Sequence, residues 1–408
     1  MLDLKRTSWN VFSGAQLAFG PNAVTTLTGI ATRHAAQRIF LITDNTLEES
    51  GAVRQIRKAI DQTDAELHVF LESQVEPSTD TVERTASIAR DYKPDLMIAL
   101  GGGSKMDLAK ASRAMVDSGC TAESLLGFNN VPEPTTKTTL ICIPTTSGTG
   151  SEVSHSAILT GSTTGTKTAV LSQHIRPDIA IVDPYMTLSC PARLTAESGF
   201  VALTHAIEAY LATNFFEFAE TVDGLPYEGN NPFGDLYAEK AIRLITQHLK
   251  RATEEPDHLA ARSGMSLAAT VAGTAFSNCG GGLCHAFEST IGPQTEHGSH
   301  GTVSAIVLPE VVRFLAQHRP GKIKSVAACL NDEFSHLSND EAPDAVIDFL
   351  SQLRNNLDLP GRLTAIGIDA SHLPELVTAS FSQHRLINLT PGAPTSADGL
   401  SILNACLK

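Results

Sequence analysis

The chain has 408 residues, which is enough for about two domains that each bury a hydrophobic core. Its formal net charge is -14 and no basic stripe interrupts the acidity, which argues against nucleic acid and anionic membranes as partners. No apolar stretch reaches the roughly 18 residues that span a bilayer, and the N-terminus does not resemble a signal peptide. The seven cysteines lack metal-finger spacing, so we expect a soluble cytoplasmic protein with reduced thiols.

The first half of the chain alternates strand-length apolar runs with helical patterns. Residues 9–19 carry no long helical pattern and predict an N-terminal hairpin. Helical patterns at 50–62 and 79–92 lie between the apolar runs, so a parallel sheet with right-handed crossovers is the economical topology. The predicted strands are 38–42, 66–71, 96–100, 139–143 and 179–182.

From Pro191 onward the strand signals stop and helical periodicity dominates. A glycine- and proline-containing stretch at 215–231 predicts a long inserted loop. The sequence therefore predicts an α/β N-terminal dinucleotide-binding domain with a parallel sheet, residues 1–190, and an all-α C-terminal domain, residues 191–408. The predicted helices of the second domain are 195–213, 233–252, 259–276, 302–317, 342–357 and 370–381.

A glycine-rich run follows the predicted strand at 96–100. It reads GGGSKMDLAK and begins with Gly101, Gly102 and Gly103. Glycines let the backbone turn sharply and approach a diphosphate, and the helix that they open presents free N–H groups and a positive dipole end to the anion. The run predicts a dinucleotide site, although a strand-to-helix turn also uses glycine for purely structural reasons.

A second loop, IPTTSGTGSE at 143–152, follows the strand predicted at 139–143. It gathers hydroxyl groups and glycines, as expected around a ribose or a phosphate. Two further runs are THAIEAY at 204–210 and a histidine-bearing stretch at 282–309 that begins GLCHAFESTIGPQTEHGSHG.

Together with the run IVDPYMTLSCP at 181–191, these motifs resemble the iron-containing (group III) alcohol dehydrogenase family of the dehydroquinate synthase-like superfamily. The resemblance covers nearly the whole chain, and the motifs occur in the family's order. It implies an NAD(P)-dependent oxidoreductase with a metal between two domains. It also implies a set of cofactor-binding residues: Gly101, Gly102, Gly103, Ser104, Asp107, Thr145, Thr146, Ser147, Thr149, Ser151, Lys167 and Leu188.

Three polar positions in this half have alternative interpretations. Asp44 ends a predicted strand, where a carboxylate can bind an adenosine ribose and repel a 2′-phosphate, which favours NAD over NADP; the alternative is a helix cap. Asp107 matches the family motif but is also typical of first-turn electrostatics. Lys167 matches a family position near the nicotinamide ribose, and the alternative is a solvated loop lysine.

The family's metal site is altered in this chain. The family places an aspartate four residues before the histidine of THAIEAY, and here that position is Val201. The resemblance carries the other ligands, which are also the candidate catalytic residues, onto His205, His285 and His300. A family histidine one turn after His285 is Ser289. His297 is a possible substitute ligand, and Glu288 or Glu296 could supply a carboxylate.

We expect the three histidines to converge in a cleft between the domains, facing the nicotinamide end of the cofactor. Any divalent metal there, Fe²⁺ or Zn²⁺, is expected to bind more weakly than with an aspartate present. Alternatively the site holds no metal, and imidazolium groups of His205, His285 or His300 polarise the carbonyl, as in reductases resembling maleylacetate reductase.

We therefore expect an NAD(H)-dependent oxidoreductase that interconverts a small alcohol or hydroxy acid and its aldehyde or oxo-acid by hydride transfer. The insertion at 215–231 resembles that of hydroxyacid–oxoacid transhydrogenases, which favours a hydroxy acid. Alternatives are a non-redox, NAD-using lyase of the same superfamily and a binding protein with a decayed metal site. The apolar segment around 11–19 and the family resemblance predict a homodimer or a higher homo-oligomer.

Overall fold

The computed structural model describes residues 5–12, 14–72, 76–162, 165–218, 226–295 and 298–408. The chain divides into two compact units: Ser13–Cys190 forms an α/β unit, and the segment up to Phe12 joins Pro191–Lys408 in a helical unit. The N-terminal segment belongs with the helices because Arg6 forms a buried ion pair with Glu228, with Nη1 3.0 Å from Oε2. The backbone N–H of Phe12 also donates to Oδ1 of Asn278 at 2.8 Å.

A parallel sheet forms the centre of the α/β unit, as predicted, with six strands among the described residues in the order β1-β9-β6-β4-β2-β3. The apolar runs form these strands because β-branched and aliphatic side chains pack well on a sheet that is covered on both faces. The strands are β1 (Gln16–Phe19), β2 (Arg38–Thr43), β3 (Glu66–Leu71), β4 (Leu96–Gly101), β6 (Thr139–Pro144) and β9 (Ile179–Val182).

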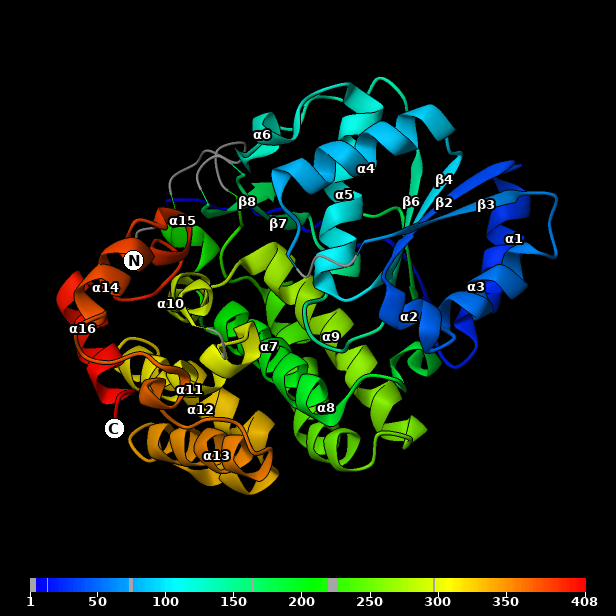
Figure 1. Ribbon diagram of the computed structural model, residues 1–408. Coiled ribbons are helices and arrows are strands. Elements are labelled where there is room, and N and C mark those ends of the chain that lie inside the picture. The colour runs from blue at the N-terminus through cyan, green and yellow to red at the C-terminus, as the bar shows by residue number, and fades with distance from the viewer. Residues whose placement is uncertain (1–4, 13, 73–75, 163–164, 219–225, 296–297) are drawn as a thin grey trace. The chain divides into compact units, whose positions relative to one another are not determined.

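Helices cover both faces of this sheet (Figure 1). Alternate residues of β2 point to opposite faces, so Phe40 and Ile42 pack with α4 (Thr79–Tyr92) and α5 (Gly103–Ser118). Ile39 and Leu41 of the same strand pack with α1 (Thr26–Arg33) and α3 (Ala52–Ile60). The short helices α2 (Asn45–Glu49) and α6 (Ala122–Leu125) complete the helices of this unit that the described residues include.

Two features of the α/β unit differ from the prediction. The N-terminal hairpin is wrong, because β1 pairs in parallel with β9, Gln16 facing Ile179, and forms one edge of the main sheet. The sequence also gave no sign of a second, three-stranded sheet of β5 (Gly127–Phe128), β8 (Lys167–Leu171) and β7 (Ser156–Thr160). These strands have only two to five residues each, so their apolar runs are too short to give a clear strand signal.

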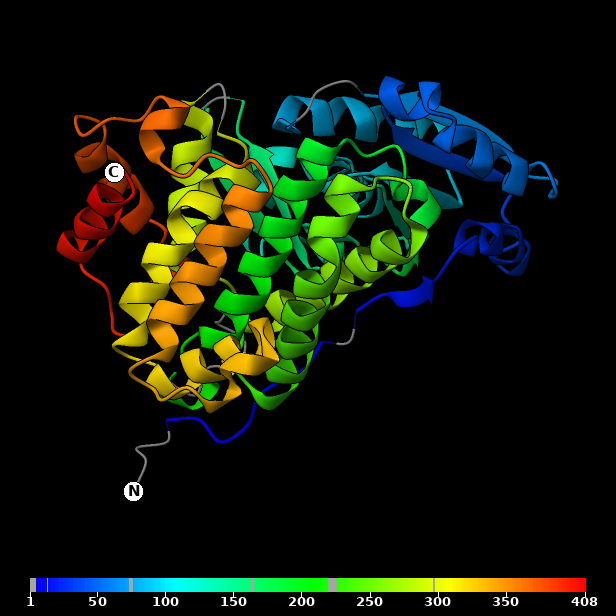
Figure 2. The ribbon, with the colours of Figure 1, turned by 90° about the horizontal axis from the view of Figure 1, so that it is seen from below.

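The second unit is helical, as predicted, and its long helices lie side by side in Figure 2. Residues 219–225 of the predicted inserted loop lie outside the described part of the chain, and Phe215–Glu217 form a short 3-10 turn. In the part of the chain that the structure describes, no helix is long and apolar enough to cross a membrane. The helices are α7 (Ala192–Leu211), α8 (Pro232–Glu254), α9 (Leu259–Cys279), α10 (Leu283–Ile291), α11 (His300–Ala316), α12 (Pro320–Leu330), α13 (Ala342–Asn356), α14 (Leu373–Phe381), α15 (His384–Ile387) and α16 (Ser396–Ala405).

Candidate functional site

The glycine run forms the turn from β4 into α5. Gly101 has φ +157°, and a Cβ there would come within 2.6 Å of the Lys105 side chain. A Cβ on Gly103 would come within 2.8 Å of Thr149, so the second loop packs directly on the first. Gly102 is the N-cap of α5 and makes no side-chain capping bond, so the first-turn N–H groups have no capping side chain. This cradle, which a side chain would fill, fits a pyrophosphate.

Polar side chains hold the hydroxyl-rich loop against α5. The carboxylate of Asp107 accepts hydrogen bonds from Ser151 Oγ at 2.6 Å and from the N–H of Ile158 at 3.0 Å. Lys110 is fully buried and donates to Ser151 Oγ at 2.7 Å and to Ser154 Oγ at 3.0 Å. Burial lowers the pKa of Lys110, and the nearby Asp107 carboxylate opposes this shift. Asp107 therefore links α5 to the hydroxyl-rich loop and lies beyond the first turn of the helix.

Lys110 is a residue that the sequence analysis missed. Its signal was present, because it ends the glycine-run motif three residues after Asp107, which is one helical turn. The hydroxyl-rich loop also reaches the glycine turn through its backbone, since Thr145 N donates to Gly101 O at 3.0 Å. The predicted cofactor residues 101–104 and 145–151 are thus gathered at the carboxyl ends of the adjacent strands β4 and β6.

Asp44 follows β2 and is the N-cap of α2. Its carboxylate accepts from Leu47 N at 3.0 Å, so the alternative interpretation as a helix cap describes the local geometry. The charge of Asp44 also acts on Lys105 of α5: burial lowers the pKa of Lys105, and Asp44 opposes that shift. The ribose role of Asp44 stays a prediction.

Two other predicted cofactor residues occupy ordered positions. Lys167 begins β8 and forms an ion pair with Glu76. Its side chain is 12 % exposed, so the alternative of a solvated loop lysine is wrong. Leu188 follows the 3-10 turn Pro184–Thr187, which Asp183 caps by accepting from the N–H of Tyr185.

Helix α7 carries the first candidates of the helical unit. Val201, His205 and Glu208 are buried, with exposed fractions of 5 %, 6 % and 3 %. Glu208 Oε1 accepts from the backbone N–H of Cys284 at 2.7 Å, and its Oε2 contacts Nδ1 of His285. The glycine turn before α10 permits this approach, because a Cβ on Gly282 would lie 3.2 Å from Glu208 Oε1. Glu208 was not predicted as a site residue, although it belongs to the run THAIEAY.

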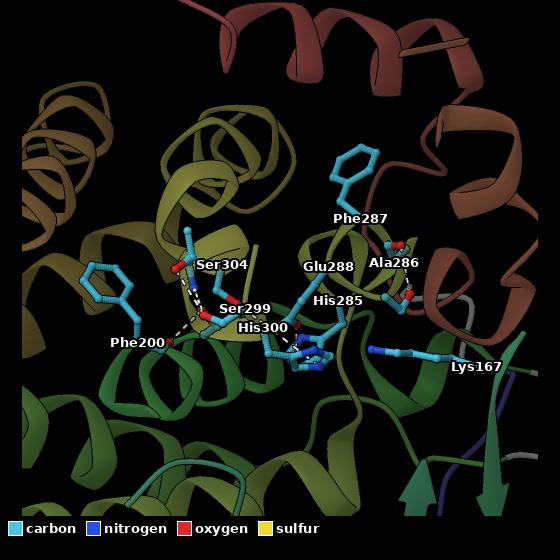
Figure 3. A network of polar contacts seen from close by, with 12 residues as sticks. Lys167, Phe200, His285, Ala286, Phe287, Glu288, Ser299, His300 and Ser304 are labelled. Carbon is cyan, nitrogen blue, oxygen red and sulfur yellow. Dashed lines mark hydrogen bonds and ion pairs between the residues drawn. The ribbon is translucent and has the colours of Figure 1, made fainter. Parts of the chain in front are cut away.

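Three of the predicted side chains meet near the start of α10 and α11. The rings of His205 and His285 stack, with centroids 4.8 Å apart and planes 10° apart. Figure 3 shows His285 and Glu288 of α10 and His300 of α11 pointing toward one another. Glu288 lies with Oε2 3.7 Å from His285 Nε2 and Oε1 3.5 Å from His300 Nε2. Within this unit His205 therefore lies against His285, and Glu288 links His285 to His300, while the convergence of all three histidines on one point stays a prediction.

His285 lies between two buried carboxylates. Burial lowers the pKa of His285, but the charges of Glu288 and Glu208 outweigh this effect, so the pKa lies above its ordinary value. Its Nε2 is buried and makes no hydrogen bond to the described residues. Such an imidazole can present one N–H to a ligand while the other nitrogen is held by Glu208.

Ser289 occupies the position where the family resemblance implies a proton-transferring histidine. Its hydroxyl donates to Ala286 O at 3.0 Å and accepts from the side-chain amide of Gln383. These neutral groups fix the end of α10, but they do not replace the imidazole.

The family resemblance also implies a metal, and the described residues do not fit one. Val201 places a buried apolar side chain where the carboxylate is implied. A metal lies in the plane of each ligating imidazole, about 2.1 Å from the nitrogen, so the stacked rings of His205 and His285 cannot both ligate one ion as they stand. In the described ranges, no group of three or more His, Cys, Asp or Glu side chains is placed to hold a metal. His297 and Glu296 lie outside those ranges.

A parallel sheet with a glycine turn into α5, joined in one chain to a helical unit with two buried, stacked histidines, is an arrangement typical of dehydrogenases that use a dinucleotide. Comparison with family models is consistent with this class. Residues 15–184 match the model "Iron-containing alcohol dehydrogenase" and residues 195–407 match "Fe-containing alcohol dehydrogenase family, C-terminal". The chain belongs to the iron-containing alcohol dehydrogenase family and is an enzyme of this oxidoreductase family.

Curated relatives match along most of their length. The chain is 35 % identical to long-chain-alcohol dehydrogenase 1 of Geobacillus thermodenitrificans, covering 91 % of this chain and 90 % of that one. It is 31 % identical to the mitochondrial hydroxyacid-oxoacid transhydrogenase of Bos taurus, covering 91 % and 84 %.

Solved structures share the fold. A 1,3-propanediol oxidoreductase has a TM-score of 0.89 at 25 % identity and covers 98 % of this chain and 100 % of that one. A sulfoacetaldehyde reductase from Bifidobacterium kashiwanohense, solved in complex with NAD+, has a TM-score of 0.84 at 24 % identity and covers 98 % and 99 %.

Proposed function

We propose that this enzyme is an NAD(H)-dependent oxidoreductase that interconverts a small alcohol or hydroxy acid with its aldehyde or oxo-acid. The observation that carries the proposal is the environment of His285, whose Nδ1 is held by Glu208 while its buried Nε2 makes no hydrogen bond to the described residues. A donor held in this way can polarise a carbonyl oxygen and exchange a proton with it.

The α/β unit supplies the cofactor site. The N-terminus of α5 and the glycines 101–103 would hold the pyrophosphate, and Asp44 would bind the adenosine ribose, which favours NAD over NADP. Thr145, Thr146, Ser147 and Thr149 line the second loop beside this turn. When bound, the nicotinamide supplies or accepts the hydride.

The helical unit supplies the group that handles the proton. In the reducing direction, His285 donates the proton to the carbonyl oxygen as the carbon receives the hydride, so the products are the alcohol and the oxidised cofactor. In the other direction His285 accepts that proton. Glu208 keeps the ring oriented through its contact with Nδ1, and Glu288 provides negative charge beside Nε2.

The relatives support an alcohol or a hydroxy acid as the substrate. Their printed names include a long-chain-alcohol dehydrogenase and a hydroxyacid-oxoacid transhydrogenase. The transhydrogenase likeness supports the hydroxy-acid branch of the proposal.

A cofactor-consumption screen tests the proposal. Aldehydes and 2-, 3- and 4-oxo-acids are incubated with NADH or NADPH, and absorbance of the reduced nicotinamide is followed for the wild type and His285→Gln. We expect turnover with NADH, with kcat in His285→Gln reduced about 100-fold or more, the usual contribution of a general acid. His336→Gln, at an exposed histidine of the same unit, is the matched control and should keep wild-type turnover. NAD binding without net redox turnover of any carbonyl or alcohol would favour the lyase alternative.

A further inference from the structure

Glu288 occupies an unusual position for a charged side chain. It lies on α10 one turn after His285 and its exposed fraction is 0 %. Its Oε1 accepts a hydrogen bond of 2.9 Å from Ser304 Oγ, one turn after His300 on α11. The carboxylate is therefore anchored from both helices and faces Nε2 of His285 and of His300, at 3.7 Å and 3.5 Å (Figure 3).

We propose that the Glu288 carboxylate takes the place of a divalent metal between His285 and His300, so that this enzyme works without a metal bound to its histidines. The inference goes beyond the proposed function, because an NAD(H)-dependent oxidoreductase could operate with either arrangement.

Two observations carry the proposal besides the position of Glu288. Glu208 is engaged at both carboxylate oxygens, by Cys284 N and His285 Nδ1, and Glu288 is engaged at Oε1, by Ser304 Oγ. Val201 lies on α7 one turn before His205, and its buried side chain has no carboxylate to offer a metal. A metal held by Glu208 or by Oε1 of Glu288 would have to displace these contacts.

Imidazole N–H groups can compensate the buried charge of Glu288 without a metal. A buried carboxylate is costly unless positive or hydrogen-donating groups face it. His285 and His300 can provide such groups only when their Nε2 atoms carry a proton, and a protonated nitrogen has no lone pair for a metal. The stacked geometry of His205 and His285 adds to this exclusion.

Metal content of the purified protein tests the inference directly. The wild type, produced in cells supplied with iron and zinc, is measured by elemental mass spectrometry and then titrated with Fe²⁺ and Zn²⁺ by calorimetry. We expect the molar amount of metal to be at least about tenfold lower than that of protein, and we expect the titrations to show no saturable site in the micromolar range. Melting temperature with and without Zn²⁺ gives a readout that does not depend on activity.

Two variants sharpen the test. Val201→Asp/Glu288→Ala restores the family aspartate and removes the competing carboxylate, so it should gain a metal site and a Zn²⁺-dependent rise in melting temperature. Val201→Asn/Glu288→Ala is the matched control, since it has nearly the same shape without the charge and should gain neither. The wild-type measurement decides the matter even where a double variant fails to fold.

One equivalent of metal in the wild type would overturn the inference, and its loss in Glu288→Gln would identify Glu288 as a ligand instead. A metal-free wild type that also reduces no carbonyl with NADH would leave the inference standing and reject the proposed function. The two failures are therefore distinguishable.

Discussion

The ammonium group of Lys110, on α5, donates a 2.7 Å hydrogen bond to the hydroxyl of Ser151, which lies in the loop after β6. The same ammonium donates to Ser154 Oγ and to the backbone oxygen of Ser156, and it lies 3.9 Å from Asp107. One buried side chain thus ties the glycine-turn helix to the hydroxyl-rich loop. Both candidate cofactor loops depend on it for their relative position.

Replacing Lys110 with methionine should therefore weaken both folding and cofactor binding. Methionine keeps most of the packing but leaves Asp107 and the two serines without their cation, so we expect a loss of about 2–4 kcal/mol in the free energy of unfolding. Urea denaturation and calorimetry with NADH measure the two effects. Lys58→Met, at an exposed lysine of α3, is the control and should change neither; an unchanged NADH affinity in a folded Lys110→Met protein would contradict the positioning role.

Gly102→Val should abolish NADH binding while leaving the fold intact. Gly102 has φ −75°, which any residue adopts, and a Cβ there would contact the Thr146 side chain, with Oγ1 at 3.4 Å and Cγ2 at 3.6 Å. The added methyl groups would instead cover the N–H groups at the start of α5. We expect no saturable binding in calorimetry and a melting temperature close to that of the wild type.

A neighbouring glycine provides the contrast. Gly103→Val places its Cβ 2.8 Å from Thr149, so it should destabilise the α/β unit. Equal NADH affinity in folded Gly102→Val and wild type would remove the glycine turn as the pyrophosphate site.

Asp44→Asn separates the two roles of this residue. Asparagine is as good an N-cap as aspartate, so the stability of α2 should change little, whereas the negative charge that would repel a 2′-phosphate is removed. We expect the ratio of NADH to NADPH affinity to fall about tenfold, measured by fluorescence titration of both cofactors. A ratio that stays at the wild-type value would leave Asp44 as a cap alone.

Much of the fold could be predicted from the sequence because the segments with strong periodic patterns are also the buried ones. The predicted strand at 66–71 and helix at 79–92 match β3 and α4 in both bounds. The predicted N-terminal hairpin was wrong because the same apolar run can pair with an antiparallel neighbour or with the distant β9. Tertiary packing selects β9, and the local sequence does not show this. The small second sheet was not predicted because its strands of two to five residues are too short to give a periodic signal.

The site was partly readable for a different reason. The family resemblance predicted that His205 and His285 lie close together, and their rings do stack. The spacing could not show that Glu208 reaches His285, or that Glu288 faces both His285 and His300, because those contacts depend on how α7, α10 and α11 pack. The residue type alone indicated that one metal ligand is altered, since a valine side chain has no oxygen atom to coordinate a metal.

The exposed edge of the main sheet predicts a homodimer. β1 has only β9 as a neighbour in the described sheet, and its Leu17 and Phe19 side chains are 44 % and 39 % exposed. An edge strand with apolar side chains is prone to pair with another copy, so we expect a dimer mass by light scattering at micromolar concentration. Leu17→Lys should shift the protein toward the monomer because a charged lysine side chain disfavours pairing of an edge strand with another copy. Leu236→Lys, at an exposed leucine of α8, is the control and should leave the dimer intact. A monomeric wild type, or dissociation caused only by the α8 substitution, would show that this edge is not the interface.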